Sequence, residues 1–132
     1  ILTELHPFYI NLLGHELWKL DKIPDTDHVI EAWLSCYEKE ERRLIAELEK
    51  LTHKQQNMLK ALAINPIIEP TGQKFLNSIS MAYSSVRQTL KALAEKDMIY
   101  RVKKIDPAIP NLKLGQYRVL DPLLAFALRK YN

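Results

Sequence analysis

The sequence contains few of the residues on which phosphate loops, disulfides and metal sites depend. Three glycines are too few to build a glycine-rich phosphate-binding loop. The single cysteine, Cys36, excludes an internal disulfide and a cysteine-based zinc site. One thiol also fits the reducing cytoplasm in which we expect the protein to lie. No apolar run approaches the roughly 18 residues of a membrane span, so we expect no contact with a membrane.

Candidate catalytic residues and metal ligands are also sparse. His15 and Glu16 begin like the zinc motif HExxH, but Lys19 stands where the second histidine would be. Cys36 shares a predicted helix face with Trp33, so we expect a buried, inert thiol. The sequence therefore predicts no enzyme active site, no metal site and no cofactor of its own. Because the first residues have neither an initiator methionine nor the features of a signal peptide, we expect a piece of a longer protein.

Charge is divided unevenly along the chain, although the net charge is only +3. Residues 1–50 contain six Lys or Arg and eleven Asp or Glu, whereas residues 51–132 contain thirteen and five. A change of sign at the middle is typical of two parts with different partners. We predict a helical segment over 1–50 and a second domain over 51–132, whose basic charge can attract a polyanion.

The first part has the periodicity of two helices. Pro7 suits the first turn of a helix, and apolar residues follow it at helical spacing. Pro24 ends this run because the residue before a proline disfavours the helical region. Asp25 to Asp27 then offer an N-cap for a long helix over about 28–50, with a charged stretch inside it that is typical of a solvated face.

The second part is divided into short elements by its capping and breaking signals. Thr52 with Gln55, and Ser85 with Gln88, have the spacing of capping boxes, so a helix is expected to start at each. Alternating residues rich in strand formers follow the second of these helices. The predicted elements are a helix from 52, an extended piece over 67–70, helices over 71–79 (capped by Thr71) and 85–96, strands over 98–104 and 115–120 joined by a loop, and a last helix capped by Asp121.

This order predicts a mainly α protein, in which a helical segment precedes a winged helix-turn-helix with a small β-hairpin wing. Three stretches add a resemblance: THKQQNMLKALA, SSVRQTLKALAEKDMIYRV and GQYRVLDPLLAFALRKY resemble the C-terminal winged helix of prokaryotic AAA+/STAND-type ATPases. HPFYINLLGHELW looks like that family's helical lid. The resemblance implies a parent ATPase that binds ATP and Mg²⁺ through Walker motifs, which this sequence lacks. In the family's Gly-x-Pro lid motif the proline lies near the nucleotide; Pro7 matches it, while Leu5 stands in place of the glycine.

A winged helix that binds duplex DNA places its third helix in the major groove and its wing near the backbone. The N-terminal end of such a helix reaches the base edges, where arginine pairs with guanine and glutamine with adenine. Serine hydroxyls and N–H groups at the helix start suit phosphate. The residues predicted to contact DNA are Ser84, Ser85, Arg87, Gln88, Lys91, Lys103, Lys104 and Lys113.

Other interpretations stay open at this point. Ser85 and Gln88 can be capping residues only, Lys91 can be an ordinary solvated lysine, and Glu95 would repel phosphate. Many winged helices bind proteins, so the module can instead be autoinhibitory and dock on its own ATPase core or on a partner protein. That interaction would use apolar wing residues such as Ile105 and Leu114. A stand-alone regulator that dimerises through its first helices is a third possibility.

Overall fold

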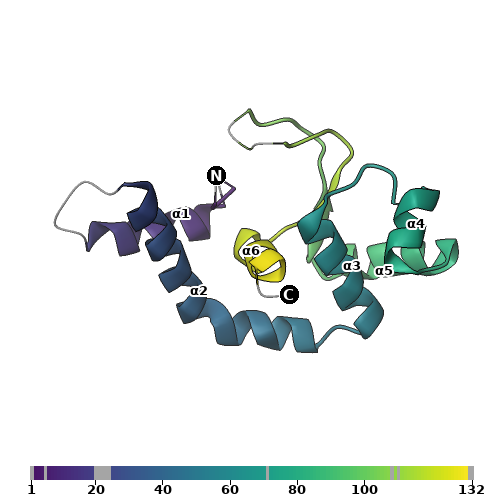
Figure 1. The fold of residues 1–132 in the computed structure, drawn as a ribbon, viewed down its shortest axis with the longest axis horizontal. Helices are drawn as coiled ribbons and strands as arrows, with labels where there is room; N and C mark the ends of the chain where they lie inside the picture. Colours follow the sequence, from purple (N-terminus) through teal and green to yellow (C-terminus); the bar gives the residue numbers. More distant parts are fainter. Residues whose placement is uncertain are drawn as a thin grey trace.

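The computed structural model describes residues 2–4, 6–19, 25–70, 72–107, 109 and 111–130. Helices α1 (Pro7–Trp18) and α2 (Thr26–Glu49) pack against each other at the N-terminal side of the molecule (Figure 1). α2 starts two residues before its predicted position. Asp25 is the N-cap, as predicted, and its carboxylate accepts a 2.9 Å hydrogen bond from the His28 amide. None of the helices in these described ranges has the length and apolar character of a membrane span.

Three helices form the helix-turn-helix part: α3 (His53–Ile64), α4 (Gln73–Ile79) and α5 (Tyr83–Glu95). The capping box predicted at the start of α3 is confirmed, because Thr52 accepts from the Gln55 amide and Gln55 accepts from the Thr52 amide. Thr71, the predicted cap of α4, lies outside the described residues, and Gly72 is the N-cap of that helix.

The capping box predicted at the start of α5 is wrong. Ser80 adopts a left-handed conformation (φ 53°) that ends α4, and the extended residue Ala82 already serves as the N-cap of α5. Tyr83 and Ser84 therefore wind into the first turn, and Ser85 becomes the third helical residue rather than the cap. In the described part of the chain no side chain caps α5, so the amides of its first turn have no side-chain acceptor.

A small sheet closes the winged helix. β1 (Ile99–Arg101) and β2 (Tyr117–Val119) pair antiparallel, with Ile99 opposite Val119 and Arg101 opposite Tyr117. Both strands are shorter than predicted. The extended piece after α3 joins the sheet through one bridge, in which the Tyr117 amide donates a 2.7 Å hydrogen bond to the Ile67 carbonyl. We call residues 102–116, which connect β1 to β2, the wing.

The last helix, α6 (Pro122–Lys130), lies between α2 and α3 (Figure 1). Leu59 and Leu62 of α3, Leu93 of α5 and Leu123 of α6 are fully buried in the shared core. Trp33 of α2 is also fully buried and meets the ring of Phe126 edge-on, with ring centroids 6.1 Å apart. The helical segment thus adds its aromatic residues to the core of the winged helix. The predicted boundary at residues 50–51 falls in the turn between α2 and α3 and stays a prediction.

Candidate nucleic-acid interface

The outer face of α5 carries five of the predicted contact residues. Val86, Thr89, Leu90 and Leu93 form the buried face of this helix. The helical spacing therefore turns the opposite side chains to solvent together. On that outer face Ser84, Arg87, Gln88 and Lys91 are exposed and Ser85 is half-buried.

The guanidinium of Arg87 is held within the first turn of α5. Its Nη1 donates a 3.1 Å hydrogen bond to the Tyr83 hydroxyl, and its Cζ lies 5.8 Å from the centre of the Tyr83 ring. A cation over an aromatic face at this distance gains attraction from the ring quadrupole. Arg87 is therefore partly pre-positioned at the end of the helix that would meet base edges.

Arg101 of β1 joins this surface and was missed by the sequence reasoning. Its Nε donates a 3.2 Å hydrogen bond to the Gly115 carbonyl, and its guanidinium carbon lies 5.5 Å from the centre of the Tyr117 ring. The signal was present in the strand alternation. Arg101 shares its side of the sheet with the buried Ile99, two residues earlier, and so projects past the edge of the core toward α5.

A groove of about 460 Å³ is lined by residues of α5, the sheet and the extended piece before α4. Arg87 and Lys91 line it from the helix, and Arg101 lines it from the strand. Glu69, from the extended piece before α4, brings one carboxylate to the same groove. Three cations against one anion leave the groove positive. The remaining lining residues are Ile68, Pro70, Tyr83, Leu90, Ala94 and Tyr117.

The three wing lysines predicted to contact phosphate are exposed, but they do not join the α5 groove among the described residues. Lys103 and Lys104 follow β1 along the outgoing side of the wing. Lys113 lies on the returning side, where its amide donates a 3.2 Å hydrogen bond to the Gln116 side chain. A neighbouring hollow brings Lys113 together with Lys74 of α4, a cation that the sequence reasoning did not single out.

The wing also exposes apolar side chains. Ile105 is 46 % exposed and Leu114 is 57 % exposed, whereas Ile109 and Leu112 are half-buried. Ile68, beside the wing residue Gly115, is 46 % exposed. The features expected for DNA binding and for protein binding therefore both occur near the wing.

Pro7 and Cys36, which the sequence analysis also singled out, do not line the α5 groove. Pro7 is the exposed first residue of α1. Cys36 is fully buried, as predicted, and burial raises the pKa of its thiol to about 11, with a further contribution from the Glu16 carboxylate. A thiol that stays protonated and enclosed is a poor nucleophile.

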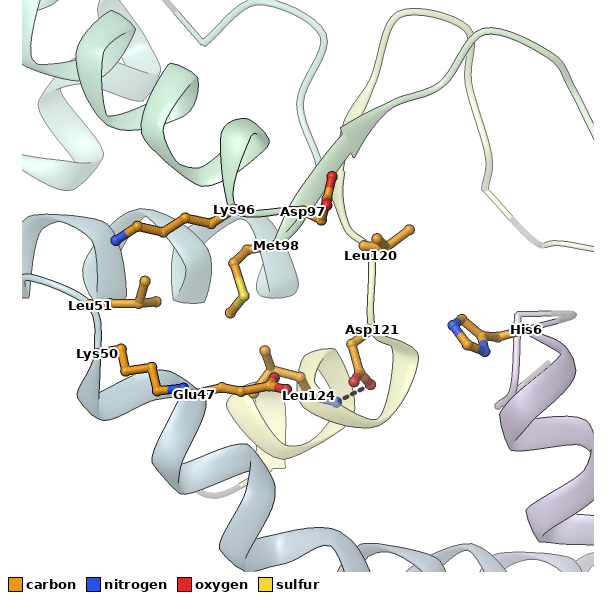
Figure 2. Close-up of a pocket in the computed structure, with 10 residues that line it drawn as sticks. All are labelled: His6, Glu47, Lys50, Leu51, Lys96, Asp97, Met98, Leu120, Asp121 and Leu124. Carbon is orange, nitrogen blue, oxygen red and sulfur yellow. Dashed lines mark hydrogen bonds between the residues drawn. The ribbon is translucent and has the colours of Figure 1, made fainter.

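A second hollow, of about 480 Å³, opens where α2, the end of α5 and the start of α6 meet. Figure 2 shows Met98 and Leu124 within this junction, with charged side chains from the end of α2 and from the residues that follow α5 around them. Its lining contains three carboxylates and two lysines, so its charges largely cancel and give it no positive excess to attract a polyanion.

Residues 44–130 match the sequence family described as "probable winged helix domain". The match covers more than half of the chain, and its range runs from α2 through α6. The chain belongs to this winged-helix family. Comparison with curated proteins and with solved structures gave no match. The helix order, the two-stranded wing sheet and the family match agree and establish the winged-helix fold.

Proposed function

We propose that this winged helix binds duplex DNA, with α5 in the major groove and the wing on the adjacent phosphate backbone. The observation that carries the proposal is the positive groove to which α5 contributes Arg87 and Lys91 and β1 contributes Arg101. Clustered basic side chains on one face supply the phosphate attraction that dominates DNA affinity. A helix that exposes arginine and glutamine at its N-terminal end suits base readout.

Each predicted residue has a role in this arrangement. Arg87 has the fork geometry for guanine, and Gln88 can pair with adenine. The first turn of α5 contains no acidic residue, so the amides and hydroxyls at Ser84 and Ser85 can donate hydrogen bonds to a phosphate at the positive end of the helix. Lys91 would contact phosphate from the next turn. Lys103, Lys104 and Lys113 would contact the backbone from the wing.

The test is fluorescence anisotropy of the chain with a labelled random-sequence duplex, at low and then physiological salt. We expect a Kd on the order of micromolar or weaker for non-specific DNA, rising steeply with salt. Arg87→Ala should weaken binding to a preferred site by about fivefold to a hundredfold. Lys91→Ala should flatten the salt dependence by about one unit of slope. Arg42→Ala, on the exposed face of α2, is the matched control. A folded chain that binds no duplex at low salt would contradict the proposal.

A second candidate is a protein-interaction or autoinhibitory module. The observation in its favour is the exposure of Ile105 and Leu114 on the wing. Leu114→Ser separates the two functions. It should leave DNA affinity within about twofold if the lysines make the wing contact, because the leucine carries no charge for phosphate. If the duplex does not bind, the apolar wing becomes the surface with which to search for a protein partner.

We propose further that this module belongs to a cytoplasmic AAA+/STAND-type ATPase, whose core would be its other partner. The proposal rests on the resemblance of the lid-like and winged-helix stretches. ATP and Mg²⁺ would bind to the parent's Walker motifs outside these 132 residues, and Pro7 would face the nucleotide. Calorimetric titration of the chain with Mg-ATP should accordingly give no binding heat. Saturable binding would show that nucleotide chemistry lies within this chain.

A further inference from the structure

A buried polar network lies at the base of the wing. Its side chains have no part in the proposed contact with DNA. Its centre is Arg118 of β2, which is only 8 % exposed. One arm of the guanidinium, Nη2, donates a 2.6 Å hydrogen bond to the Glu4 carboxylate. The other arm, Nη1, donates a 3.2 Å hydrogen bond to the Gln116 side-chain oxygen. Arg118 therefore links residues 2–4, which we call the N-terminal segment, to the base of the wing.

Gln116 carries the connection into the wing itself. It is 6 % exposed, and its side-chain oxygen accepts from the Lys113 amide as well as from Arg118. Its side-chain nitrogen donates to the Pro66 carbonyl at 3.3 Å, and its backbone carbonyl accepts from the Val102 amide at 2.8 Å. The turn on which Lys113 lies is closed by a 3.2 Å backbone bond from the Gln116 amide to the Lys113 carbonyl, and the Gln116 side chain adds the acceptor for the Lys113 amide.

The Glu4 end of the network is also held in place. Glu4 adopts a left-handed conformation (φ 45°), which costs a residue with a Cβ about 1 kcal/mol or more. The neighbouring residue Thr3 is 5 % exposed, and its carbonyl accepts a 2.9 Å hydrogen bond from the His6 amide at the start of α1. The surrounding structure therefore enforces the position from which Glu4 reaches Arg118.

A buried guanidinium cannot lose its carboxylate and stay where it is. An uncompensated charge at this depth is costly, so Arg118 without Glu4 would turn toward solvent. Gln116 would then lose a donor that orients its amide, and the Lys113 amide would lose a fixed acceptor. The planar fork matters because its two arms reach Glu4 and Gln116 separately, whereas a lysine at position 118 would have to reach both acceptors from a single nitrogen.

We propose that Glu4 and Arg118 are positioning residues for the wing. The N-terminal segment, through this ion pair, sets the placement of Lys113 against DNA phosphate. The effect on the contact between Lys113 and DNA rests on the proposed DNA binding. The coupling between Glu4 and the wing does not depend on it. A displacement of the segment that precedes α1 would in this way change DNA affinity without any change in α5.

The experiment uses variants that separate placement from charge. Arg118→Lys keeps the net charge, and Arg42→Lys on the exposed face of α2 is its control. Glu4→Gln adds one positive charge overall, and the exposed Glu31→Gln makes the same change elsewhere. Thermal melts confirm folding, and if Arg118→Lys does not fold, Glu4→Gln decides. Amide hydrogen exchange at Lys113, measured by NMR, reports the coupling without DNA.

We expect Lys113 amide exchange to accelerate at least about tenfold in Arg118→Lys and Glu4→Gln and to stay unchanged in both controls, since the acceptor is no longer fixed. Anisotropy should show duplex affinity about threefold to tenfold lower in Arg118→Lys, with the salt slope flatter by about one unit. Lys113→Ala should then lower duplex affinity much less in the Arg118→Lys background than in the parent protein. A general loss of stability would not produce this non-additivity.

Unchanged exchange at Lys113 in both variants would overturn the coupling. If Lys113→Ala lowers duplex affinity equally in the two backgrounds, the proposal that the coupling affects DNA binding is overturned. A chain that binds no duplex would instead contradict the proposed function, and the exchange measurement would still decide whether Glu4 positions the wing.

Discussion

The hydroxyl of Tyr9 donates a 2.7 Å hydrogen bond to Oδ2 of Asp121, a residue 112 positions later. Nη2 of Arg43 donates to the same hydroxyl at 2.6 Å and lies 3.6 Å from the carboxylate. The other carboxylate oxygen accepts from the amides of Leu123 and Leu124 and so caps α6, as Figure 2 shows for Leu124. One aspartate therefore fastens α1 and α2 to the helix that completes the winged helix.

Tyr9→Phe should destabilise the protein by about 1 to 2 kcal/mol. Tyr9 is 1 % exposed, so the change removes a buried hydroxyl from between Asp121 and Arg43 while the ring stays in the core. Urea denaturation followed by circular dichroism measures the free energy of unfolding. Tyr83→Phe is the control, because Tyr83 is 52 % exposed and should change stability by less than about 0.5 kcal/mol. If Tyr9→Phe and Tyr83→Phe change the free energy of unfolding equally, the hydroxyl of Tyr9 adds nothing to the stability that its ring provides.

The sequence predicted the order of the elements but not this link. Apolar spacing and capping boxes are local signals, and they located α3, α4, the two strands and α6 with small errors at the ends. The start of α5 was misplaced because the left-handed Ser80 shortened the turn before it, and no glycine marked that position. Gln116 and Arg118 gain their roles from partners 50 and 114 residues away in sequence, which no local pattern contains.

Asp97→Gly should stabilise the protein by about 1 kcal/mol. Asp97 follows α5 with φ 55°, and its amide and that of Met98 bond back to the Ala94 and Leu93 carbonyls in the manner of a Schellman cap. Glycine adopts this conformation without the Cβ cost and removes a negative charge from the helix C-terminus. Thermal denaturation measures the gain. Asp97→Ala keeps the Cβ and should gain less; an equal gain would assign the whole effect to charge.

Arg101→Ala should weaken duplex binding and flatten its salt dependence by about one unit of slope. Arg101 brings the only strand-derived cation among the residues that line the α5 groove. Anisotropy over a salt series measures both quantities. Arg42→Ala is again the matched control, and circular dichroism should show that both variants keep their helices. An unchanged slope for Arg101→Ala would confine the DNA contact to α5 and the wing lysines.

Glu69→Gln should strengthen duplex binding by about twofold to tenfold at low salt. Its carboxylate shares the groove with Arg87, Lys91 and Arg101 and would repel a phosphate that entered it. The gain should fade as salt screens the repulsion. Glu31→Gln makes the same change of net charge away from the groove and gives the baseline. An equal gain from both variants would assign the effect to overall charge.

Stability should fall as the pH rises from about 9 to about 11, in part because of Cys36. The pKa of this buried thiol is about 11, against an ordinary value of 9.0, so the folded state keeps its proton after the unfolded chain has lost it. The stabilisation from this difference is therefore complete below pH 9 and is lost through the folded pKa. Two units of pKa correspond to about 2.7 kcal/mol at full ionisation, most of which should be lost in this pH range.

The comparison with Cys36→Ala isolates the thiol from the other groups that titrate in this range. Burial also raises the pKa of Tyr9, so part of the alkaline loss should remain in the variant. Urea denaturation at pH 8 and near pH 10.5 should show the gap in unfolding free energy between parent and variant shrinking by about 1 to 2 kcal/mol at the higher pH. The cavity left by the missing sulfur does not titrate, so it lowers the unfolding free energy of the variant by the same amount at both pH values. A gap that stays constant with pH would mean that the thiol ionises as readily in the folded protein as in the unfolded chain.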